Sequence, residues 1–253
     1  MPWNPEQYHK FKADRLAPFN DLLGLIKFRS GLSVLDLGCG TGELALALAE
    51  KLPQSRVTGV DSSPQMLEKA QAHRSAIVEF KPGDVESLQG EWDLLFSHAV
   101  LHWVDNHAAL IPRLWGHVKP GGQLAVQIPS NHRHPSHTCI MAAASEEPFK
   151  TALRGWVRHS PVLEIDQYAQ LLHSCGAADF TVLEKVYPTC LPEAAAIAEW
   201  TRGTTMVPYF ERLPRELHEP FLDRYRELLR EALPKGPLLF TFRRILFAAT
   251  RSA

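Results

Sequence analysis

The sequence predicts an α/β fold in which helices wind over both faces of a parallel β-sheet. Between residues 32 and 128, short apolar runs alternate with stretches whose apolar residues recur at helical spacing. A glycine-rich turn directly follows the first apolar run. Strands separated by helices of this length form βαβ units, and successive units place their strands side by side in one sheet.

The strand–helix alternation begins with LSVLDL, a leucine-rich run that stops at glycines. The first helix is expected to end before Pro53, and the second to begin with Ser63 as its N-cap and Pro64 at its first position. The expected elements, in order, are a strand at 32–37, a helix at 42–52, a strand at 56–61, a helix at 63–73, strands at 76–80 and 93–97, a helix at 105–117 and a strand at 122–128.

After residue 128 the pattern becomes mainly helical. The segment 138–175 is expected to be helical, with breaks at Pro148 and Pro161. Strands are expected at 179–189 and 237–251, with helices at 192–202 and 214–233 between them. Because these two helices lie between consecutive strands, we interpret them as part of a small helical cap rather than a separate domain, with cap elements at about 136–165 and 190–235.

Composition narrows the functional class. The chain has 253 residues, 45% of them hydrophobic, and a formal net charge of -1 without a basic block, which argues against a nucleic-acid binder. Its four cysteines form no C-x-x-C pair, as in a reduced intracellular protein. No apolar run reaches the ~20 residues of a membrane span, and the N-terminus has no apolar signal core. We therefore expect a soluble cytoplasmic enzyme that does not bind membranes.

The segment LDLGCGTGEL carries the most specific signal. It combines the end of a strand, an acid at Asp36, and glycines at positions 38, 40 and 42, directly before a helix. Glycine lets a backbone turn sharply and approach a ligand closely. The spacing is G-x-G-x-G rather than the G-x-G-x-x-G of dinucleotide binders, and a glycine loop alone is weak evidence.

Acidic residues after the next two strands strengthen the signal. Asp61 ends the second strand, where a carboxylate can accept hydrogen bonds from both ribose hydroxyls of an adenosine ligand. Asp84 follows the third strand and could accept a hydrogen bond from an adenine amino group. Each acid alone is more often a cap or turn residue. Their order, together with FSHAVLHWVDN after the fourth strand and VKPGGQL before the fifth, predicts an adenosine-containing cofactor.

This set of motifs resembles the class I S-adenosylmethionine-dependent methyltransferases. The resemblance implies a Rossmann-like, doubly wound, seven-stranded and mostly parallel sheet with an antiparallel last strand. The glycine loop would hold the methionine end of S-adenosyl-L-methionine, Asp61 the ribose, and Asp84 the adenine, with His98 near the sulfonium. The implied cofactor-binding residues are Asp36, Gly38, Cys39, Gly40, Gly42, Asp61, Ser62, Met66, Asp84, Val85, His98 and Trp103.

A narrower resemblance, to the trans-aconitate methyltransferases, runs through most of the chain. It rests on WNPEQYHKF, GVDSSPQML, LHWVDNH, AVQIPSN, HPSH and FLDRYRELLREALP. Members of that family form the methyl ester of trans-aconitate. The resemblance implies an N-terminal helical lid at 1–31, with Trp3, Tyr8 and Phe11 over the pocket, and a methyltransferase domain at 32–253. Ordinary packing of an N-terminal helix is the competing explanation for these aromatic residues.

An anionic substrate calls for cations and hydrogen-bond donors. The substrate-binding candidates are Trp3, Tyr8, Asn131, His137, Arg224 and Arg244. Either arginine could instead form a surface ion pair, the commoner role of arginine. The chain departs from the family pattern at His102, where glutamine is usual, and at Arg133 and His134, where the family is neutral or acidic. These departures bear on the identity of the acceptor more than on the reaction.

The expected chemistry needs no general base. A carboxylic acid is already ionised at pH 7, so methyl transfer to it would rest on positioning and desolvation. No catalytic side chain is therefore assigned, and His98 and His102 are candidates only for an acceptor that must lose a proton. The competing functions are a methyltransferase acting on a malonyl-thioester carboxylate or a small-molecule hydroxyl, and a module that binds the cofactor without catalysis.

The segment QIPSNHRHPSH contains three histidines within six residues, His132, His134 and His137. Their H-x-H-x-x-H spacing, without a neighbouring cysteine or second carboxylate, does not match a common zinc site, so no metal is expected. Lining of the substrate pocket and an exposed loop both remain open as explanations. We expect a small-molecule acid as partner, no nucleic acid, and a monomer or weak homodimer.

Overall fold

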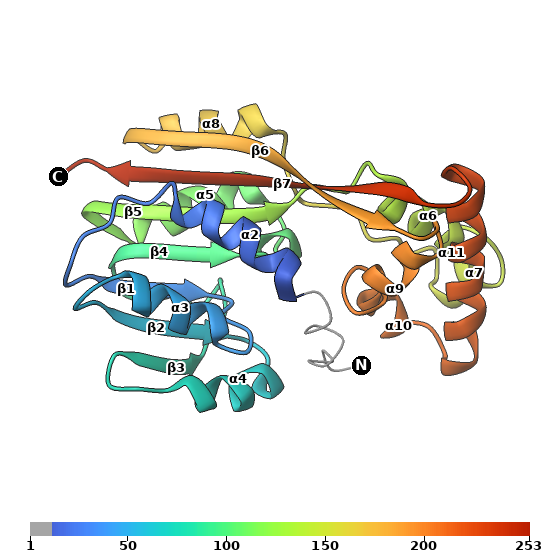
Figure 1. Ribbon diagram of the computed structural model, residues 1–253, viewed down its shortest axis with the longest axis horizontal. Coiled ribbons are helices and arrows are strands. Elements are labelled where there is room, and N and C mark those ends of the chain that lie inside the picture. Colours follow the sequence, from blue (N-terminus) through green and yellow to red (C-terminus); the bar gives the residue numbers. More distant parts are fainter. Residues whose placement is uncertain (1–11) are drawn as a thin grey trace. The chain divides into compact units, whose positions relative to one another are not determined.

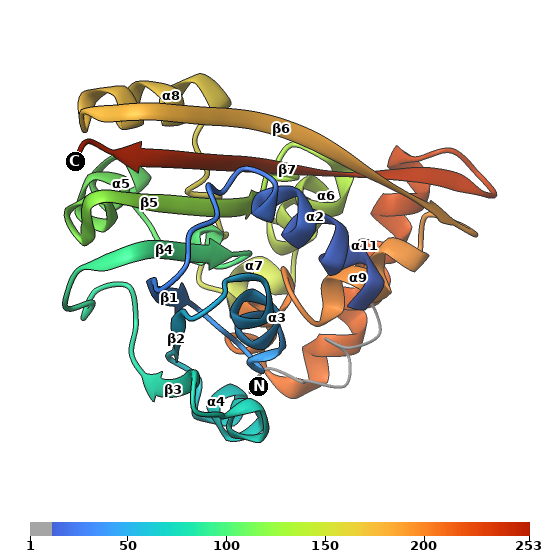
Figure 2. The ribbon, with the colours of Figure 1, turned by 60° about the vertical axis from the view of Figure 1, so that its left-hand side comes forward.

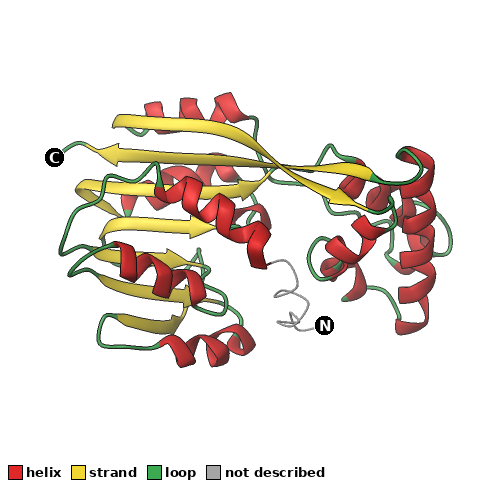
Figure 3. Ribbon diagram, viewed as in Figure 1, coloured by secondary structure: helices red, strands yellow, loops and turns green. Residues whose placement is uncertain are grey.

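The computed structural model describes residues 12–253, and side chains from residue 16 onwards. The chain divides into two compact units (Figure 1). One comprises residues 130–160 and 186–243 and is called here the helical unit. The other, the sheet unit, comprises residues 12–129, 161–185 and 244–253 of the described part. The helical unit contains more helix than strand, and most strand residues belong to the sheet unit (Figure 3).

The strands form one seven-stranded sheet with the order β3-β2-β1-β4-β5-β7-β6. β1 pairs in parallel with β2 and β4, β2 with β3, and β4 with β5, whereas β7 is antiparallel to β5. After β1 the chain continues to β2 on one side, and after β4 it continues to β5 on the other side. Open α/β sheets bind ligands at the carboxyl ends of two such neighbouring strands. The strands are β1 (Ser33–Leu37), β2 (Arg56–Asp61), β3 (Val78–Pro82), β4 (Trp92–His98), β5 (Val118–Pro129), β6 (Ala177–Leu191) and β7 (Leu238–Arg251).

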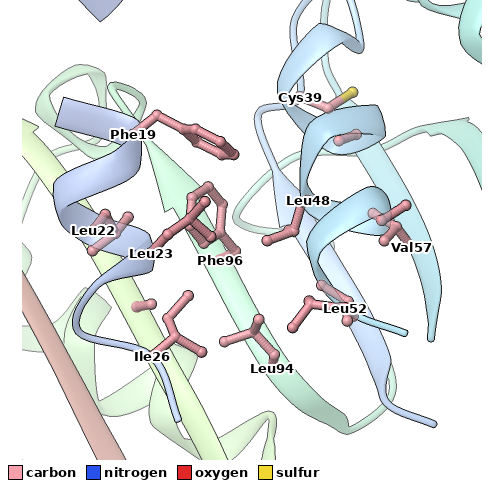
Figure 4. Packing of buried hydrophobic residues seen from close by; sticks show 14 of the residues in the cluster. Phe19, Leu22, Leu23, Ile26, Cys39, Leu48, Leu52, Val57, Leu94 and Phe96 are labelled. Atoms are coloured by element: carbon pink, nitrogen blue, oxygen red, sulfur yellow. The ribbon is translucent and has the colours of Figure 1, made fainter. Parts of the chain in front are cut away.

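Helices cover both faces of the sheet unit. α2 (Lys12–Leu23), α3 (Glu43–Lys51) and α4 (Pro64–Ala70) pack on one face, and α5 (His107–Gly116) and α8 (Ile165–Ser174) on the other. Figures 1 and 2 show α2 lying over β4 and β5. Side chains of a strand alternate between faces, and β4 follows this rule: Leu94 and Phe96 join the α2 side, and Leu95 joins the α5 side. Figure 4 shows the α2 side of this core.

The helical unit has its own apolar core, which is rich in aromatic residues. At its centre the Tyr225 hydroxyl donates to the Ser136 carbonyl oxygen at 2.9 Å and accepts from the Thr201 hydroxyl at 3.2 Å, so the buried polar group is satisfied. Its helices are α6 (Pro135–Ala144), α7 (Phe149–Ala152), α9 (Ala196–Arg202), α10 (Val207–Phe210) and α11 (His218–Ala232). Short 3-10 turns occur at η1 (Gln71–His73), η2 (Leu101–Trp103) and η3 (Arg215–Leu217).

The element order follows the sequence-based expectation, but several bounds differ: β5 begins at Val118 rather than at residue 122, and α9 begins at Ala196 rather than at residue 192. The third strand begins at Val78 rather than at residue 76, because a turn at Ser75 precedes it: the Ser75 hydroxyl accepts from the Val78 backbone N–H at 3.2 Å. The expected helix at 138–175 was wrong between residues 153 and 164, which form turns and extended chain. Gly155, with φ of 73°, and Pro161 interrupt the helical path there. No helix between residues 12 and 253 is long and apolar enough to cross a membrane.

Truncation of a core side chain tests the packing on the α2 side. Leu94 is fully buried, so Leu94→Ala removes apolar contacts and leaves a cavity. We expect it to lower the free energy of unfolding by about 2–5 kcal/mol, measured by urea denaturation. Ile77→Ala is the control, because Ile77 is an exposed apolar residue of the same sheet unit; it should change stability by less than about 0.5 kcal/mol. Equal losses in the two variants would contradict this description of the core.

Candidate active site

The glycine loop joins β1 to α3 in a conformation that needs glycine. Gly38, Gly40 and Gly42 have φ of 76°, 56° and 81°. A Cβ atom on Gly38 would lie 2.2 Å from Cγ2 of Val100, whereas one on Gly40 would meet nothing within 4 Å. Gly38 is therefore required for close packing, whereas the half-buried Gly40 faces open space. The motif read from the sequence forms a strand–turn–helix with an accessible peptide at its centre.

The carboxylate of Asp61 links this loop to the end of β2. Its Oδ2 atom accepts from the Gly40 backbone N–H at 2.9 Å, and its Oδ1 atom accepts from the Ser63 backbone N–H at 2.8 Å. Ser63 is the N-cap of α4, and its hydroxyl accepts from the Met66 backbone N–H. Each oxygen keeps a lone pair for a further donor. Asp61 is thus held in one orientation at the carboxyl edge of the sheet while able to accept hydrogen bonds from a diol.

Asp36 lies within β1, two residues before the loop, and is almost completely buried. Its Oδ2 atom has no hydrogen-bond partner among the described residues. Burial, and then the negative charge of Asp61, raise its pKa to about 7. Burial and the same two carboxylates raise the pKa of the neighbouring Cys39 thiol, which stays protonated and is not a nucleophile. A buried acceptor with no partner is suited to a cationic or hydrogen-bonding ligand.

The next strand end supplies the residues expected at the adenine. Asp84 follows β3 and is exposed, and its Oδ1 atom accepts from the Ser87 hydroxyl at 2.8 Å and from the backbone N–H of Ser87 and Glu86. These hydrogen bonds, those of Ser87 first, lower the pKa of Asp84 and keep it ionised. Val85 is buried in the core on the α5 side. Two further residues expected to bind the cofactor follow β2: Ser62 is exposed, and Met66 is buried at the start of α4.

A buried chain of hydrogen bonds holds the turn η2, which follows β4. The ring of His107 bonds the Leu101 carbonyl through Nε2 at 2.9 Å and the Tyr168 hydroxyl through Nδ1 at 2.5 Å. A carbonyl only accepts, so Nε2 carries the proton, and Nδ1 accepts from Tyr168. Tyr168 in turn accepts from the Leu163 backbone N–H. Burial lowers the pKa of His107, which keeps the ring neutral.

The turn held in this way carries two of the expected site residues. The rings of His102 and Trp103 lie 4.7 Å apart between centroids, and both are half-buried. His98, the last residue of β4, is buried and contacts Phe19 edge-on at 6.2 Å between centroids. His107 and Tyr168 were not expected from the sequence. A histidine in an otherwise apolar helix was the available signal, but its partner lies 61 residues away in the chain.

The substrate-binding candidates fall into different parts of the chain. Asn131, His137 and Arg224 belong to the helical unit, and Arg244 to the sheet unit, whereas Trp3 and Tyr8 lie outside the described residues. Arg244 is buried, and its Nη1 atom donates to Oε1 of Gln127 at 3.2 Å. The structure therefore brings Arg244 to β5 of the sheet and the other three described candidates to the second unit.

The side chains of Asn131 and Arg224 form hydrogen bonds to other residues of the helical unit. The Asn131 amide is buried; its Oδ1 atom accepts from the Arg243 backbone N–H at 2.5 Å, and its Nδ2 atom donates to the Thr241 carbonyl at 3.3 Å. The Arg224 guanidinium binds Glu146 through two hydrogen bonds, at 2.6 and 2.9 Å. These contacts favour structural roles for both residues, Asn131 in fastening the loop to β7 and Arg224 in joining α11 to the end of α6.

The histidines of the 127–137 segment serve mainly local structure. His134 is the N-cap of α6, where its Nδ1 atom accepts from the Ser136 backbone N–H at 3.1 Å. His137 is half-buried between the hydroxyls of Ser136 and Thr205. Burial first, and then the nearby His132, His134 and Arg158, lower its pKa to about 3, so it is neutral. Within the described residues, no group of three or more His, Cys, Asp or Glu side chains is arranged to hold a metal ion.

Comparison with known proteins assigns these features to a family. Residues 34–122 match the family described as a methyltransferase domain. A trans-aconitate 2-methyltransferase of Deinococcus radiodurans is 48% identical over 99% of both chains, and one of Paracidovorax citrulli is 36% identical over 99% of both. This chain belongs to the trans-aconitate 2-methyltransferase family. Family membership confirms the resemblance predicted from the sequence motifs.

Solved structures share the fold at low sequence identity. The YcgJ protein from Bacillus subtilis has a TM-score of 0.63 at 16% identity, covering 94% of this chain and 99% of its own. Phosphoethanolamine N-methyltransferase 2 of Haemonchus contortus, solved with S-adenosyl-L-methionine, has a TM-score of 0.55 at 18% identity, covering 92% of this chain and 53% of its own. These similarities, with the observed strand order, confirm the predicted seven-stranded, doubly wound sheet.

The raised pKa of Asp36 predicts a pH-dependent stability. Because its folded-state pKa is about 7, against an ordinary value of 3.8, its contribution is fully present below pH 4 and is lost as the pH rises through 7. Asp36→Asn removes this loss. We expect the variant to gain stability relative to the wild type between pH 4 and pH 8, by up to about 4 kcal/mol. Urea denaturation of both proteins across this range measures the difference, and a difference independent of pH would contradict the prediction.

Proposed function

We propose that this protein transfers the methyl group of S-adenosyl-L-methionine to a carboxylate of trans-aconitate and forms its methyl ester. The observation that carries the proposal is the 48% identity, over 99% of both chains, to a trans-aconitate 2-methyltransferase. The sheet unit adds support, since a glycine loop, a held carboxylate and a second acid follow three neighbouring strands in the order that an extended nucleoside ligand requires.

The residues present fit this cofactor. Within residues 12–253 the buried Asp36 Oδ2 atom has no hydrogen-bond partner, and the Gly40 peptide lies beside open space that a side chain would fill. We assign the glycine loop and Asp36, with Cys39, to the methionine end. Asp61, beside Ser62 and Met66, is assigned to the ribose. Asp84 and Val85 are assigned to the adenine, and His98 and Trp103 to the region near the sulfonium.

The bound cofactor supplies a methyl group attached to a positively charged sulfur. When the methyl group is transferred, the sulfur leaves as a neutral thioether, which is a good leaving group. The acceptor carboxylate is ionised at pH 7 and is itself the nucleophile, so no side chain has to remove a proton. The protein's part is to orient the carboxylate in line with the methyl carbon and to exclude water. His98 and His102 would act as bases only for a hydroxyl or amine acceptor.

A methyl-transfer assay tests the reaction. With S-adenosyl-L-methionine labelled in its methyl group, we expect base-labile label on trans-aconitate, because a methyl ester is cleaved by hydroxide. Citrate, isocitrate and a malonyl thioester are the comparison acceptors. Label on one of these, and none on trans-aconitate, would move the assignment to another acid. Cofactor binding in calorimetry without turnover of any acceptor would favour a binding module.

Asp61 tests the cofactor assignment separately. Asp61→Ala removes the acceptor for the Gly40 N–H and the acceptor proposed for the ribose hydroxyls. We expect the affinity for S-adenosylhomocysteine to fall by about 2–3 kcal/mol in calorimetry, as for lost hydrogen bonds to a charged group. Glu79→Gln is the control, because Glu79 lies on the neighbouring β3 and bonds the Thr58 hydroxyl. Unchanged affinity in Asp61→Ala would contradict the cofactor assignment.

A further inference from the structure

On one face of the sheet, the side chains at the carboxyl edge form a row of polar residues. On the α2 side, Phe96 of β4 pairs with Ala125 of β5, and both belong to the apolar core. Two residues further along the same strands, His98 pairs with Gln127. Side chains alternate along a strand, so both point to the same face as the apolar pair before them. The face thus changes from apolar to polar at the edge where α/β sheets bind ligands.

Arg244 of β7 completes this row. Gln127 pairs with Leu246 and Pro129 pairs with Arg244, so the arginine is the diagonal neighbour of Gln127 on the same face. Its Nη1 atom donates to the Gln127 Oε1 atom at 3.2 Å. Both side chains are buried, with exposed fractions of 6% and 0%. The guanidinium carries a positive charge and only hydrogen-bond donors, so it favours an anion as the ligand beside Gln127.

The contact with Arg244 determines which way the Gln127 amide points. A guanidinium has only donors, so the amide must turn its oxygen toward Arg244 and its Nε2 atom away. In that position Nε2 has no hydrogen-bond partner among the described residues, although it is fully buried. A buried donor without a partner destabilises the protein, because it has lost its hydrogen bonds to water. Gln123, four residues earlier on the same face, shows the contrast: its amide bonds the Lys27 backbone through both Nε2 and Oε1.

We infer that Gln127 and Arg244 bind a carboxylate, and that this carboxylate belongs to the methyl acceptor. The inference rests on the proposed function and adds a specificity-determining residue to it. Gln127 Nε2 and the Arg244 guanidinium are donors from adjacent strands, and a carboxylate accepts several hydrogen bonds at once. An analogue without an acceptor at this position would leave the buried Gln127 Nε2 donor unpaired, and sites of this kind reject such analogues strongly.

The other possible source is the carboxylate of the cofactor's methionine part. Asp36, whose Oδ2 atom has no partner in the described part of the chain, lies on the α2 side of β1, where it pairs with Phe96 of β4. β1 and β5 lie on opposite sides of β4, so they are about 10 Å apart. The amino and carboxylate groups of a methionine are attached to one carbon atom. If Asp36 and the glycine loop hold the amino group, Gln127 and Arg244 are too distant for its carboxylate, which favours the acceptor.

Substitution of Gln127 tests the inference by binding rather than by turnover. Calorimetry would measure the Kd of trans-aconitate for the protein loaded with S-adenosylhomocysteine, and separately the Kd of S-adenosylhomocysteine. For Gln127→Leu we expect the first Kd to rise at least tenfold and the second to change less than threefold. Gln127→Glu has the same shape as the wild type and places a negative charge beside Arg244; it should weaken trans-aconitate binding at least as much.

The matched control is Gln123→Leu, a buried glutamine on the same face of the same strand. It should lower Tm, because it removes two hydrogen bonds to Lys27, and leave both Kd values within threefold of the wild type. Unchanged trans-aconitate binding in both Gln127 variants would overturn the inference. Weakened S-adenosylhomocysteine binding would also overturn it, by assigning the pair to the cofactor's carboxylate.

The same measurements separate this inference from the proposed function. A wild-type protein that binds trans-aconitate without methylating it contradicts the proposed function alone, and the Gln127 variants still test the carboxylate site. A wild-type protein that binds neither trans-aconitate nor citrate overturns the inference. Methylation of trans-aconitate by the wild type would support the proposed function. An unchanged KM for trans-aconitate in Gln127→Leu would then show that Gln127 does not bind the acceptor.

Discussion

The candidate site depends on one arrangement of main-chain hydrogen bonds between β1 and β2. The backbone N–H groups of Gly38 and Cys39 both donate to the Val60 carbonyl, at 2.8 and 2.9 Å. Because Asp61 follows Val60 directly, this arrangement brings its carboxylate to the Gly40 N–H. The same carboxylate reaches the start of α4 through the Ser63 N–H. One acidic side chain thereby joins the end of a strand, the glycine loop and the next helix.

The polar groups at the carboxyl edge of the sheet change from hydrogen-bond acceptors to donors along the strand order. Acceptors gather at β1 and β2, where Asp36 and Asp61 lie, and donors gather at β5 and β7, where Gln127 and Arg244 lie. His98 of β4 stands between them. A positively charged methyl donor and a negatively charged acceptor would each meet the complementary end of this row. Methyl transfer between them needs little from the protein beyond holding the two charges in line.

Much of the fold could be predicted because its signals are local. Strand and helix periodicity, the glycine turn and the acids at strand ends are properties of short segments, and the structure places each of them at the expected end of a strand. The differences have local causes as well. The start of β3 depends on a serine turn, and the loss of helix after residue 152 depends on Gly155 and Pro161. The sequence predicted a break at Pro161, but helical periodicity did not reveal the length of the non-helical segment or the later start of β3.

The sequence by itself determined the family, the order of the strands along the chain and the positions of the glycine loop and of the acids at the strand ends, because each follows from a motif whose members lie a few residues from a strand end. Only the tertiary structure decided how the other polar residues are used. Arg224 meets Glu146 across 78 residues, Asn131 meets the backbone of β7 across more than 100, and Arg244 turns the amide of Gln127 across 117. Whether a buried polar group is already satisfied depends on such distant partners, and that determines which side chains remain available to a ligand.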